Sequence, residues 1–141
     1  MTPRKLTPGL YIDAQPTPDE IRDLARQGFH GVISNRPDGE EENQPGAGLI
    51  EQAAREAGLA FVHIPIVPGK ITDEHVAAFG EALATMRGPV LAFCKTGTRS
   101  TFLWALGEAG RLDPRAIHAT AADAGIDVSP LMKKLEARWE A

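Results

Sequence analysis

At 141 residues the chain is long enough to bury a real hydrophobic core, and we expect residues 1–141 to form a single domain. Its net charge of −4 and ordinary globular composition, 43% hydrophobic and 24% charged, argue against nucleic acid as a partner. The sequence has no apolar run long enough for a membrane span or a signal peptide, and its one cysteine cannot form an internal disulfide, so we expect a cytoplasmic protein with no membrane partner.

Strand-like and helix-like segments alternate along the chain. Strands are predicted over 9–14, 29–34, 60–66 and 89–93, and helices over 17–28, 49–57, 72–86 and 100–108, with two more helices starting after Asp113 and Ser129. This alternation predicts an α/β fold with a mostly parallel central sheet of about four to five strands, flanked by helices. Ligands of such sheets bind beyond the carboxyl ends of the strands.

Several helix starts carry capping signals. Thr17 is placed to cap the first helix, with Pro18 at the first helical position and Glu20 completing a capping box. Gly28 is expected to end that helix, and Thr72 is expected to cap the helix over 72–86.

The segment "PVLAFCKTGTRS" places the only cysteine, Cys94, at the end of an apolar run typical of a central parallel strand. A helix that begins near Thr98 or Arg99 would turn its free N–H groups toward an anion, and such a site favours a thiolate. Gly97 allows a positive φ or a close approach to a ligand, and Arg99 could clamp two anionic oxygens.

The remaining side chains of this segment are candidates for anion binding. The hydroxyl groups of Thr98 and Ser100 could donate to the thiolate or the ligand, Lys95 adds positive charge at the rim, and Thr96 completes the loop. The alternative is that Cys94 is a buried, inert hydrophobic residue. The glycine and arginine that follow it favour a functional thiol.

Outside this loop the signals are weaker. Asn35 and Arg36 could line the same pocket or belong to a solvated turn, and His63 could touch substrate or be a satisfied strand histidine. The acidic run 40–42 is expected to be a solvated surface, and Trp139 is expected to dock the last helix. The four histidines show no metal-ligand spacing, so neither a metal nor a cofactor is predicted.

"FCKTGTRS" is similar to the signature of dual-specificity and tyrosine phosphatases, but its Cys-x4-Arg spacing is one residue short. Together with "GLYIDAQPTPDEIRDLARQGFHGVISNRPDGEE" and "HIPIVPGKITDEHVAAF", it resembles a bacterial family of phosphatase-like, rhodanese-like sulfurtransferase domains. In that family the domain occurs alone or fused to beta-lactamase-like hydrolases of the persulfide dioxygenase type. The resemblance implies a protein tyrosine phosphatase-like fold, with Cys94 and Arg99 as the catalytic residues.

Two departures from the phosphatase pattern favour sulfur over phosphorus. The shorter loop suits a thiol that carries one extra sulfur, and "HIPIVPGKI" lacks the carboxylic acid that phosphatases of this fold use to protonate a leaving alkoxide. Asp73 and Glu74 follow in the first turn of a helix, where acids are expected for the helix itself. Phe93 stands where the phosphatases usually have histidine.

The sequence therefore predicts a sulfurtransferase. Cys94 would take sulfur from thiosulfate or glutathione persulfide, and the Cys94 persulfide would pass it to cyanide, sulfite or a thiol. The resemblance adds a persulfide dioxygenase as a partner. The first alternative is a phosphatase that forms a phosphocysteine at Cys94 and acts on phosphotyrosine or a small phosphomonoester. The second alternative is an inactive anion-binding module.

Overall fold

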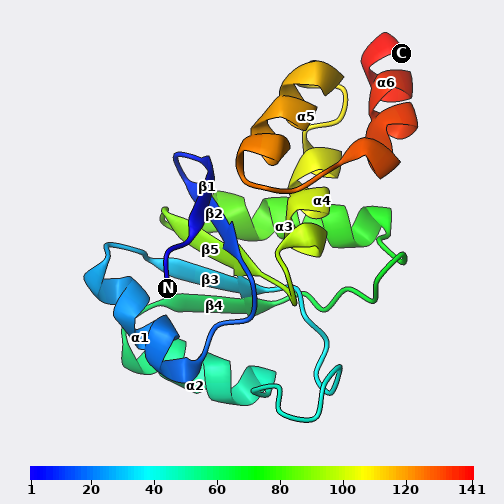
Figure 1. Ribbon diagram of the computed structural model, residues 1–141. Helices are drawn as coiled ribbons and strands as arrows, with labels where there is room; N and C mark the ends of the chain where they lie inside the picture. Colours follow the sequence, from blue (N-terminus) through cyan, green and yellow to red (C-terminus); the bar gives the residue numbers. More distant parts are fainter.

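The computed structural model describes residues 1–141 as a five-stranded sheet with helices on both faces (Figure 1). The strands are β1 (Arg4–Thr7), β2 (Leu10–Asp13), β3 (Gly31–Ser34), β4 (Ala60–His63) and β5 (Val90–Phe93). The helices are α1 (Pro18–Arg26), α2 (Ala47–Glu56), α3 (Asp73–Thr85), α4 (Thr98–Gly107), α5 (Pro114–Asp123) and α6 (Met132–Glu140), with a 3-10 turn at Ser129–Leu131.

The strand order is β1-β2-β5-β3-β4, and only β1 runs antiparallel to its neighbour. The predicted α/β class with a mostly parallel sheet is thus confirmed. The edge strand β1 was not predicted, because "RKLT" has a single large apolar residue and no strand-like alternation.

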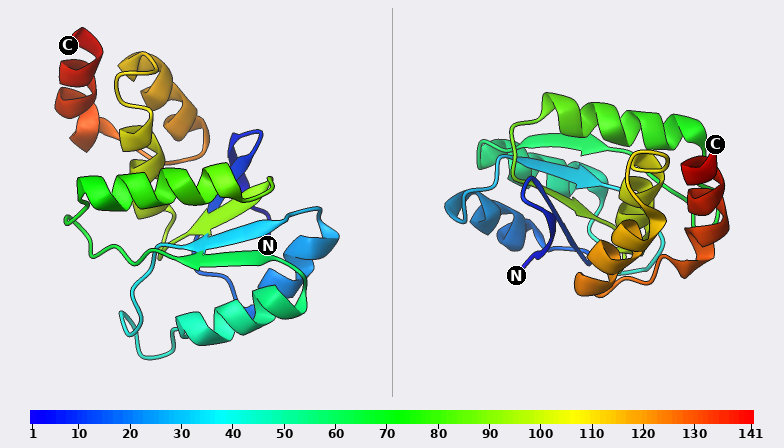
Figure 2. Two further views of the ribbon diagram at one scale, coloured as in Figure 1. Left: turned by 180° about the vertical axis from the view of Figure 1, so that it is seen from behind. Right: turned by 90° about the horizontal axis from the view of Figure 1, so that it is seen from above.

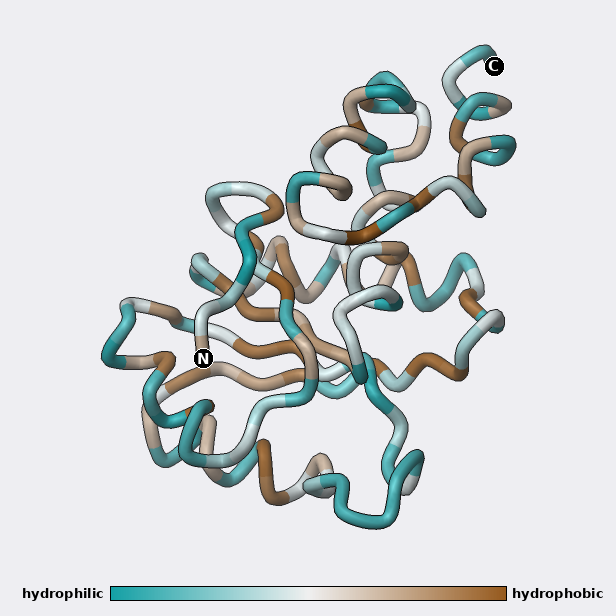
Figure 3. The backbone as a smooth tube through the Cα atoms, viewed as in Figure 1, coloured by the Kyte–Doolittle hydropathy of each residue, from teal (hydrophilic) through white to brown (hydrophobic).

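The two faces of the sheet carry separate apolar clusters. Helices α1 and α2 cover one face and α3 to α6 lie on the other, as the two views of Figure 2 show. Side chains of β5 alternate between them: Val90 and Ala92 face the α3 to α6 side, and Leu91 and Phe93 face the α1 and α2 side. In Figure 3 the central strands are accordingly the most continuous apolar part of the tube.

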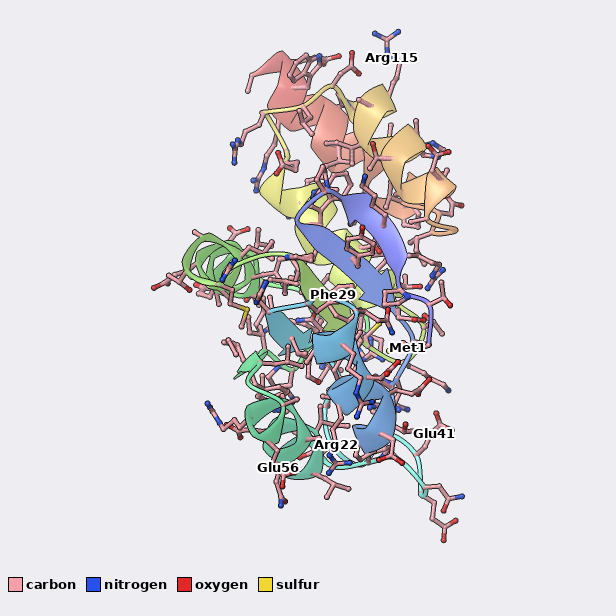
Figure 4. All side chains as sticks on the ribbon, turned by 90° about the vertical axis from the view of Figure 1, so that its left-hand side faces the viewer. Met1, Arg22, Phe29, Glu41, Glu56 and Arg115 are labelled. Atoms are coloured by element: carbon pink, nitrogen blue, oxygen red, sulfur yellow. The ribbon has the colours of Figure 1, made fainter.

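Polar contacts join the helices at the surface. Arg22 of α1 donates to Glu56 of α2 at 3.3 Å, and the two side chains lie close together in Figure 4. Such an exposed ion pair contributes little stability, about 0–1 kcal/mol. The apolar contacts beneath it therefore dominate the packing of α1 on α2.

Strand register brings four strand ends to one edge of the sheet. Asp13 and Ser34 are both paired with Phe93, and Ser34 is also paired with His63. The segment after β4 stays paired beyond the strand, because the N–H groups of Ile64 and Ile66 donate to the carbonyls of Ser34 and Asn35. The loops that follow β3, β4 and β5 therefore begin side by side, and Cys94 lies in their midst.

The capping predictions hold for α1 and α3. The side chain of Thr17 accepts from the N–H of Glu20, whose carboxylate accepts in return, and Gly28 adopts a φ of 93°. Thr72 makes the same arrangement with His75 at the start of α3. Asp73 and Glu74 lie in the first turn of α3, as expected for helix-start acids.

The C-terminal helices differ from the prediction in two details. Ser129 does not cap an α-helix but begins the 3-10 turn, and α6 starts only at Met132. Trp139 does not anchor α6 on the core, because Trp139 is 46% exposed. Leu135 is fully buried and makes this contact instead. None of the helices is both long enough and apolar enough to pass through a lipid bilayer.

Candidate active site

Cys94 lies directly after the central strand β5 and is fully buried. Its Sγ accepts a hydrogen bond from the N–H of Gly97 at 3.1 Å. The thiol belongs to neither apolar cluster, although the strand before it contributes to both. The buried thiol thus lies at the polar turn that begins α4, which is where the sequence predicts it.

Gly97 turns the chain from β5 into α4. It is the residue before the first helical position and has a φ of 96°, which only glycine adopts readily. A Cβ at this position would also lie 2.9 Å from Nη2 of Arg4 and 3.4 Å from the carbonyl oxygen of Asp13. The helix therefore starts at Thr98, which confirms the start predicted near Thr98 or Arg99 and extends the predicted segment 100–108 by two residues.

Arg4 of the edge strand β1 donates hydrogen bonds that stabilise this turn. Its Nη2 donates to the carbonyl of Thr96 at 2.9 Å and its Nη1 donates to the carbonyl of Ala124 at 2.8 Å. A residue of the edge strand thereby ties the anion loop to the end of α5. Sequence reasoning missed Arg4 because nothing in the N-terminal segment indicates a partner more than ninety residues away.

Arg99 is 9% exposed and is held by protein groups on one side of its guanidinium. Its Nη1 donates to Glu40 and to the carbonyl of Ile66, both at 2.8 Å, and its Nη2 donates to Glu40 at 3.0 Å. An arginine has five N–H donors, so Nε–H and one Nη2–H remain for another acceptor. Burial lowers the pKa of Arg99, but hydrogen bonds and negative charge from Glu40 and Cys94 raise it overall.

Glu40 corrects the prediction that the run 40–42 is a solvated surface. Its side chain is only 20% exposed, although its backbone is open to solvent, and it accepts from Arg99 and from Nε of Arg36 at 2.9 Å. The hydrogen bond from Arg99, strengthened by Arg36, lowers the pKa of Glu40 despite burial. Glu42 is exposed as expected, whereas Glu41, also exposed, accepts from Arg36 at 2.7 Å.

Arg36 and His63 face protein groups. Beyond its two carboxylate partners, Arg36 donates from Nη1 to Gln15 at 3.2 Å, and its side chain is 3% exposed. Nε2 of His63 is 2.8 Å from the carbonyl oxygen of Arg36. The loop after β3 is therefore not a solvated turn at Arg36, and His63 at the end of β4 contacts the backbone of this loop.

Asn35 and Ser100 form a buried pair beneath the loop. The hydroxyl of Ser100 donates to Oδ1 of Asn35 at 2.7 Å, and Nδ2 of Asn35 donates to the carbonyl of Ile64 at 3.1 Å. This corrects the expectation that the Ser100 hydroxyl donates to the thiolate or ligand. The pair instead joins the segments that follow β3, β4 and β5.

Lys95, Thr96 and Thr98 lie at the rim of the loop. The hydroxyl groups of Thr96 and Thr98 are 3.0 Å apart, and the exposed Lys95 places Nζ 3.5 Å from Glu41. The N–H groups of Thr98, Arg99 and Ser100 belong to the first turn of α4 and have no backbone acceptor. These donors, with the two of Arg99, are suited to hold an anion beside the thiol, and we call residues 95–100 the anion-binding turn for this reason.

The site contains one carboxylate that sequence reasoning did not place there. The sequence places Glu40 in the loop after β3. In a parallel sheet this loop begins close to the loop after β5, and this is the only indication that Glu40 could reach the site. The pairing of Glu40 with Arg99 depends on the conformation of a polar loop, and this conformation cannot be predicted from hydrophobic periodicity. In Figure 3 this loop is among the most hydrophilic parts of the chain.

Comparison with known proteins gives a consistent family and fold. Residues 3–111 match the family described as "Beta-lactamase hydrolase-like protein, phosphatase-like domain". A beta-lactamase hydrolase-like protein of Xylella fastidiosa is 42% identical over 129 residues, which are 90% of this chain and 30% of that protein. The chain thus spans less than a third of the length of this relative.

Solved structures agree with this match. A candidate phosphatase from Neisseria meningitidis is 34% identical with a TM-score of 0.88, over 98% of this chain and 99% of that one. The core catalytic domain of the yeast PP-IP phosphatase SIW14 has a TM-score of 0.69 at 14% identity, over 96% of this chain and 86% of that one. The second likeness shows a shared fold alone, which is the fold expected from the resemblance to tyrosine phosphatases.

Glu40→Gln tests the ion pairs that hold Arg99. Because the pKa of Glu40 is lowered in the folded protein, its stabilising effect is present above the ordinary value of 4.5 and disappears as the pH falls through the lowered pKa. We expect the variant to lose about 1–2 kcal/mol of unfolding free energy at pH 7 and less at acidic pH. Denaturant titrations at several pH values measure this, with Glu42→Gln as the control. An equal loss at all pH values would contradict the ion-pair account.

Arg4→Met tests the support of the anion loop. The carbonyls of Thr96 and Ala124 lose a charged donor, and we expect stability to fall by about 1–2 kcal/mol. Because the turn is then less fixed, we also expect weaker binding of inorganic phosphate by calorimetry. Lys5→Met, on the same strand, is the control. Unchanged phosphate affinity in the folded variant would show that Arg4 stabilises the fold without positioning the loop.

Proposed function

Because the chain belongs to the phosphatase-like domain family of beta-lactamase hydrolase-like proteins, we propose that it is a cysteine-dependent phosphatase. Cys94 is the nucleophile, and Arg99 with the first-turn N–H groups of α4 binds the phosphate oxygens. The observation that carries this proposal is the thiol of Cys94, which lies 3.1 Å from the N–H of Gly97 at the start of a helix, next to a fixed arginine.

The reaction proceeds in two displacements at phosphorus. The Cys94 thiolate attacks phosphorus, the S–P bond forms, and the bond to the leaving oxygen breaks with its electron pair on that oxygen. Water then attacks the phosphocysteine, the S–P bond breaks, the thiolate returns, and the proton of the water passes to phosphate or solvent. Arg99 and the helix-start donors stabilise the oxygens whose charge shifts in each step.

The polar groups around the thiol restrict the leaving group. Glu40 is the carboxylate that contacts Arg99, and since its pKa is lowered it carries no proton to donate near neutral pH. Asp73, in the first turn of α3, pairs with Arg138 of α6, whose Nη2 lies 3.7 Å from Oδ1 of Asp73. We therefore expect substrates whose leaving group is a stable anion, such as aryl phosphates, acyl phosphates and phosphoanhydrides.

A second candidate function is sulfur transfer, which the short loop between Cys94 and Arg99 favours. The thiolate would attack the outer sulfur of thiosulfate, the S–S bond would break, and sulfite would leave with the electron pair. Sulfite needs no proton, so the ionised Glu40 is no obstacle. Cyanide, or another acceptor such as sulfite or a thiol, would then remove the outer sulfur from the Cys94 persulfide.

A direct comparison of the two reactions tests the proposal. We expect wild-type protein to hydrolyse 4-nitrophenyl phosphate faster than it transfers sulfur from thiosulfate to cyanide. Mass spectrometry of acid-quenched protein should show a phosphoryl group on Cys94. Cys94→Ser should lose both activities while its melting temperature shows that it stays folded. Faster sulfur transfer with a persulfide on Cys94 would overturn the phosphatase in favour of the second candidate. No loss of activity in Cys94→Ser would overturn both.

The leaving-group argument has its own test. We expect aryl phosphates to react at least about a hundredfold faster than alkyl phosphates, because neither Glu40 nor Asp73 supplies the general-acid contribution. The ratio should be the same in Glu40→Gln, because Glu40 is not the acid. Comparable rates for aryl and alkyl phosphates, or a selective loss of alkyl phosphate hydrolysis in Glu40→Gln, would contradict the argument.

A further inference from the structure

A pocket of about 320 Å³ opens beside the anion-binding turn. Thr98 and Arg99 belong both to that turn and to the lining of the pocket. The remaining lining residues come from the segment before α3, from α4, from the 3-10 turn Ser129–Leu131 and from the start of α6. The pocket is therefore within reach of a molecule whose anionic end binds at the turn.

The lining of the pocket is mostly apolar. Its hydrophobic side chains are Ile71, Phe102, Leu106 and Leu131. Ile71, Phe102 and Leu131 are only partly buried, although all three also pack against the core. Their remaining exposed surface is available to an apolar group of a ligand. The volume lies at the lower end of the range of small-molecule sites, about 300–1,000 Å³.

Lys134 supplies a positive charge in the same pocket. It is exposed and, in contrast to Arg138 on the same helix, makes no ion pair or side-chain hydrogen bond. Lys133, its neighbour in sequence, does not line the pocket. The pocket thus combines an apolar interior with an unneutralised ammonium group, and Arg99 lines it from α4.

From this arrangement we propose that the pocket binds the non-reacting end of the substrate, and that this end is an apolar body carrying a second anionic group, such as a carboxylate. This proposal rests on the phosphatase function proposed above. The phosphate binds at the turn beside Cys94, the apolar body contacts Phe102 and Leu131, and the second anion pairs with Lys134. A substrate that consists of little more than phosphate leaves these contacts unused.

Two residues of the pocket lining come from outside the part of the chain that matches the family. Leu131 and Lys134 lie beyond residues 3–111, which are the part of the chain that matches the family. The chemical groups at the turn belong to the matched part. The selectivity of this chain for its substrate is therefore set, on the α6 side, by a segment outside the matched domain.

Non-hydrolysable phosphonates test the pocket without requiring turnover. We expect benzylphosphonate to bind the wild-type protein at least about tenfold more tightly than methylphosphonate, because its ring is removed from water. A carboxylate in 4-carboxybenzylphosphonate should add a further factor of about three, as for an exposed ion pair. Isothermal titration calorimetry measures all three ligands.

Two variants locate the effects. Lys134→Met should remove the advantage of the carboxylate and leave methylphosphonate binding unchanged, whereas Lys133→Met should change neither. Ile71→Trp should fill the pocket and remove the advantage of the benzyl group. Methylphosphonate binding serves as the test that each variant is folded and keeps the anion-binding turn.

The outcomes separate this proposal from the phosphatase function. Equal affinities for methylphosphonate and benzylphosphonate would overturn the pocket proposal alone, because the turn would still bind an anion. An equal effect of Lys133→Met and Lys134→Met would overturn the role of Lys134. If no phosphonate binds at all, both the phosphatase function and the pocket proposal are overturned.

Discussion

The site depends on the reversal of the chain at Gly97. The central strand ends at Phe93 and α4 begins at Thr98, so few residues are available to point the thiol and the helix-start N–H groups toward one place. A φ of 96° makes this possible, and the N–H of Gly97 then donates to Sγ of Cys94. Any side chain at this position would strain the backbone and meet Arg4. The thiol is thus placed by backbone geometry, and side chains such as Arg4 maintain that geometry.

The second constraint is electrostatic and joins three loops. Glu40 lies between two guanidinium groups, those of Arg36 and Arg99, and both ion pairs are partly buried. Because Arg99 also donates to the carbonyl of Ile66, its orientation is set by the loops after β3 and β4 together. The buried pair of Ser100 and Asn35 makes a parallel connection beneath it. The position of the arginine therefore does not depend on a bound anion, which reduces the entropy that binding must overcome.

The sequence was informative where local patterns determine structure. The apolar run before Cys94, the capping signals at Thr17 and Thr72 and the alternation of elements predicted the parallel sheet and the place of the thiol. Arg4, Glu40 and the hydroxyl partner of Ser100 could not be predicted in the same way. Each acts across a long stretch of chain, and hydrogen bonds between loops leave no periodic trace. The acidic run 40–42 illustrates the difference, because composition indicated solvent exposure while one of its carboxylates is held by two arginines.

The pairing of Glu40 with Arg99 also bears on the chemistry. A carboxylate whose pKa is lowered by a guanidinium stabilises that guanidinium, but it cannot at the same time provide a proton. The site therefore has a fixed positive charge at Arg99 and free N–H donors at the start of α4. The acid that contacts Arg99, Glu40, is ionised and not protonated. A phosphoryl group and the sulfonate end of thiosulfate both present anionic oxygens to such a site, so the oxygens alone do not decide between the two reactions. In the two reactions proposed above the leaving group makes the difference, since the ionised Glu40 has no proton to give it. The fold shared with phosphatases thus sets where the thiol lies, and the ionised state of Glu40 bears on which leaving groups the proposed reaction accepts.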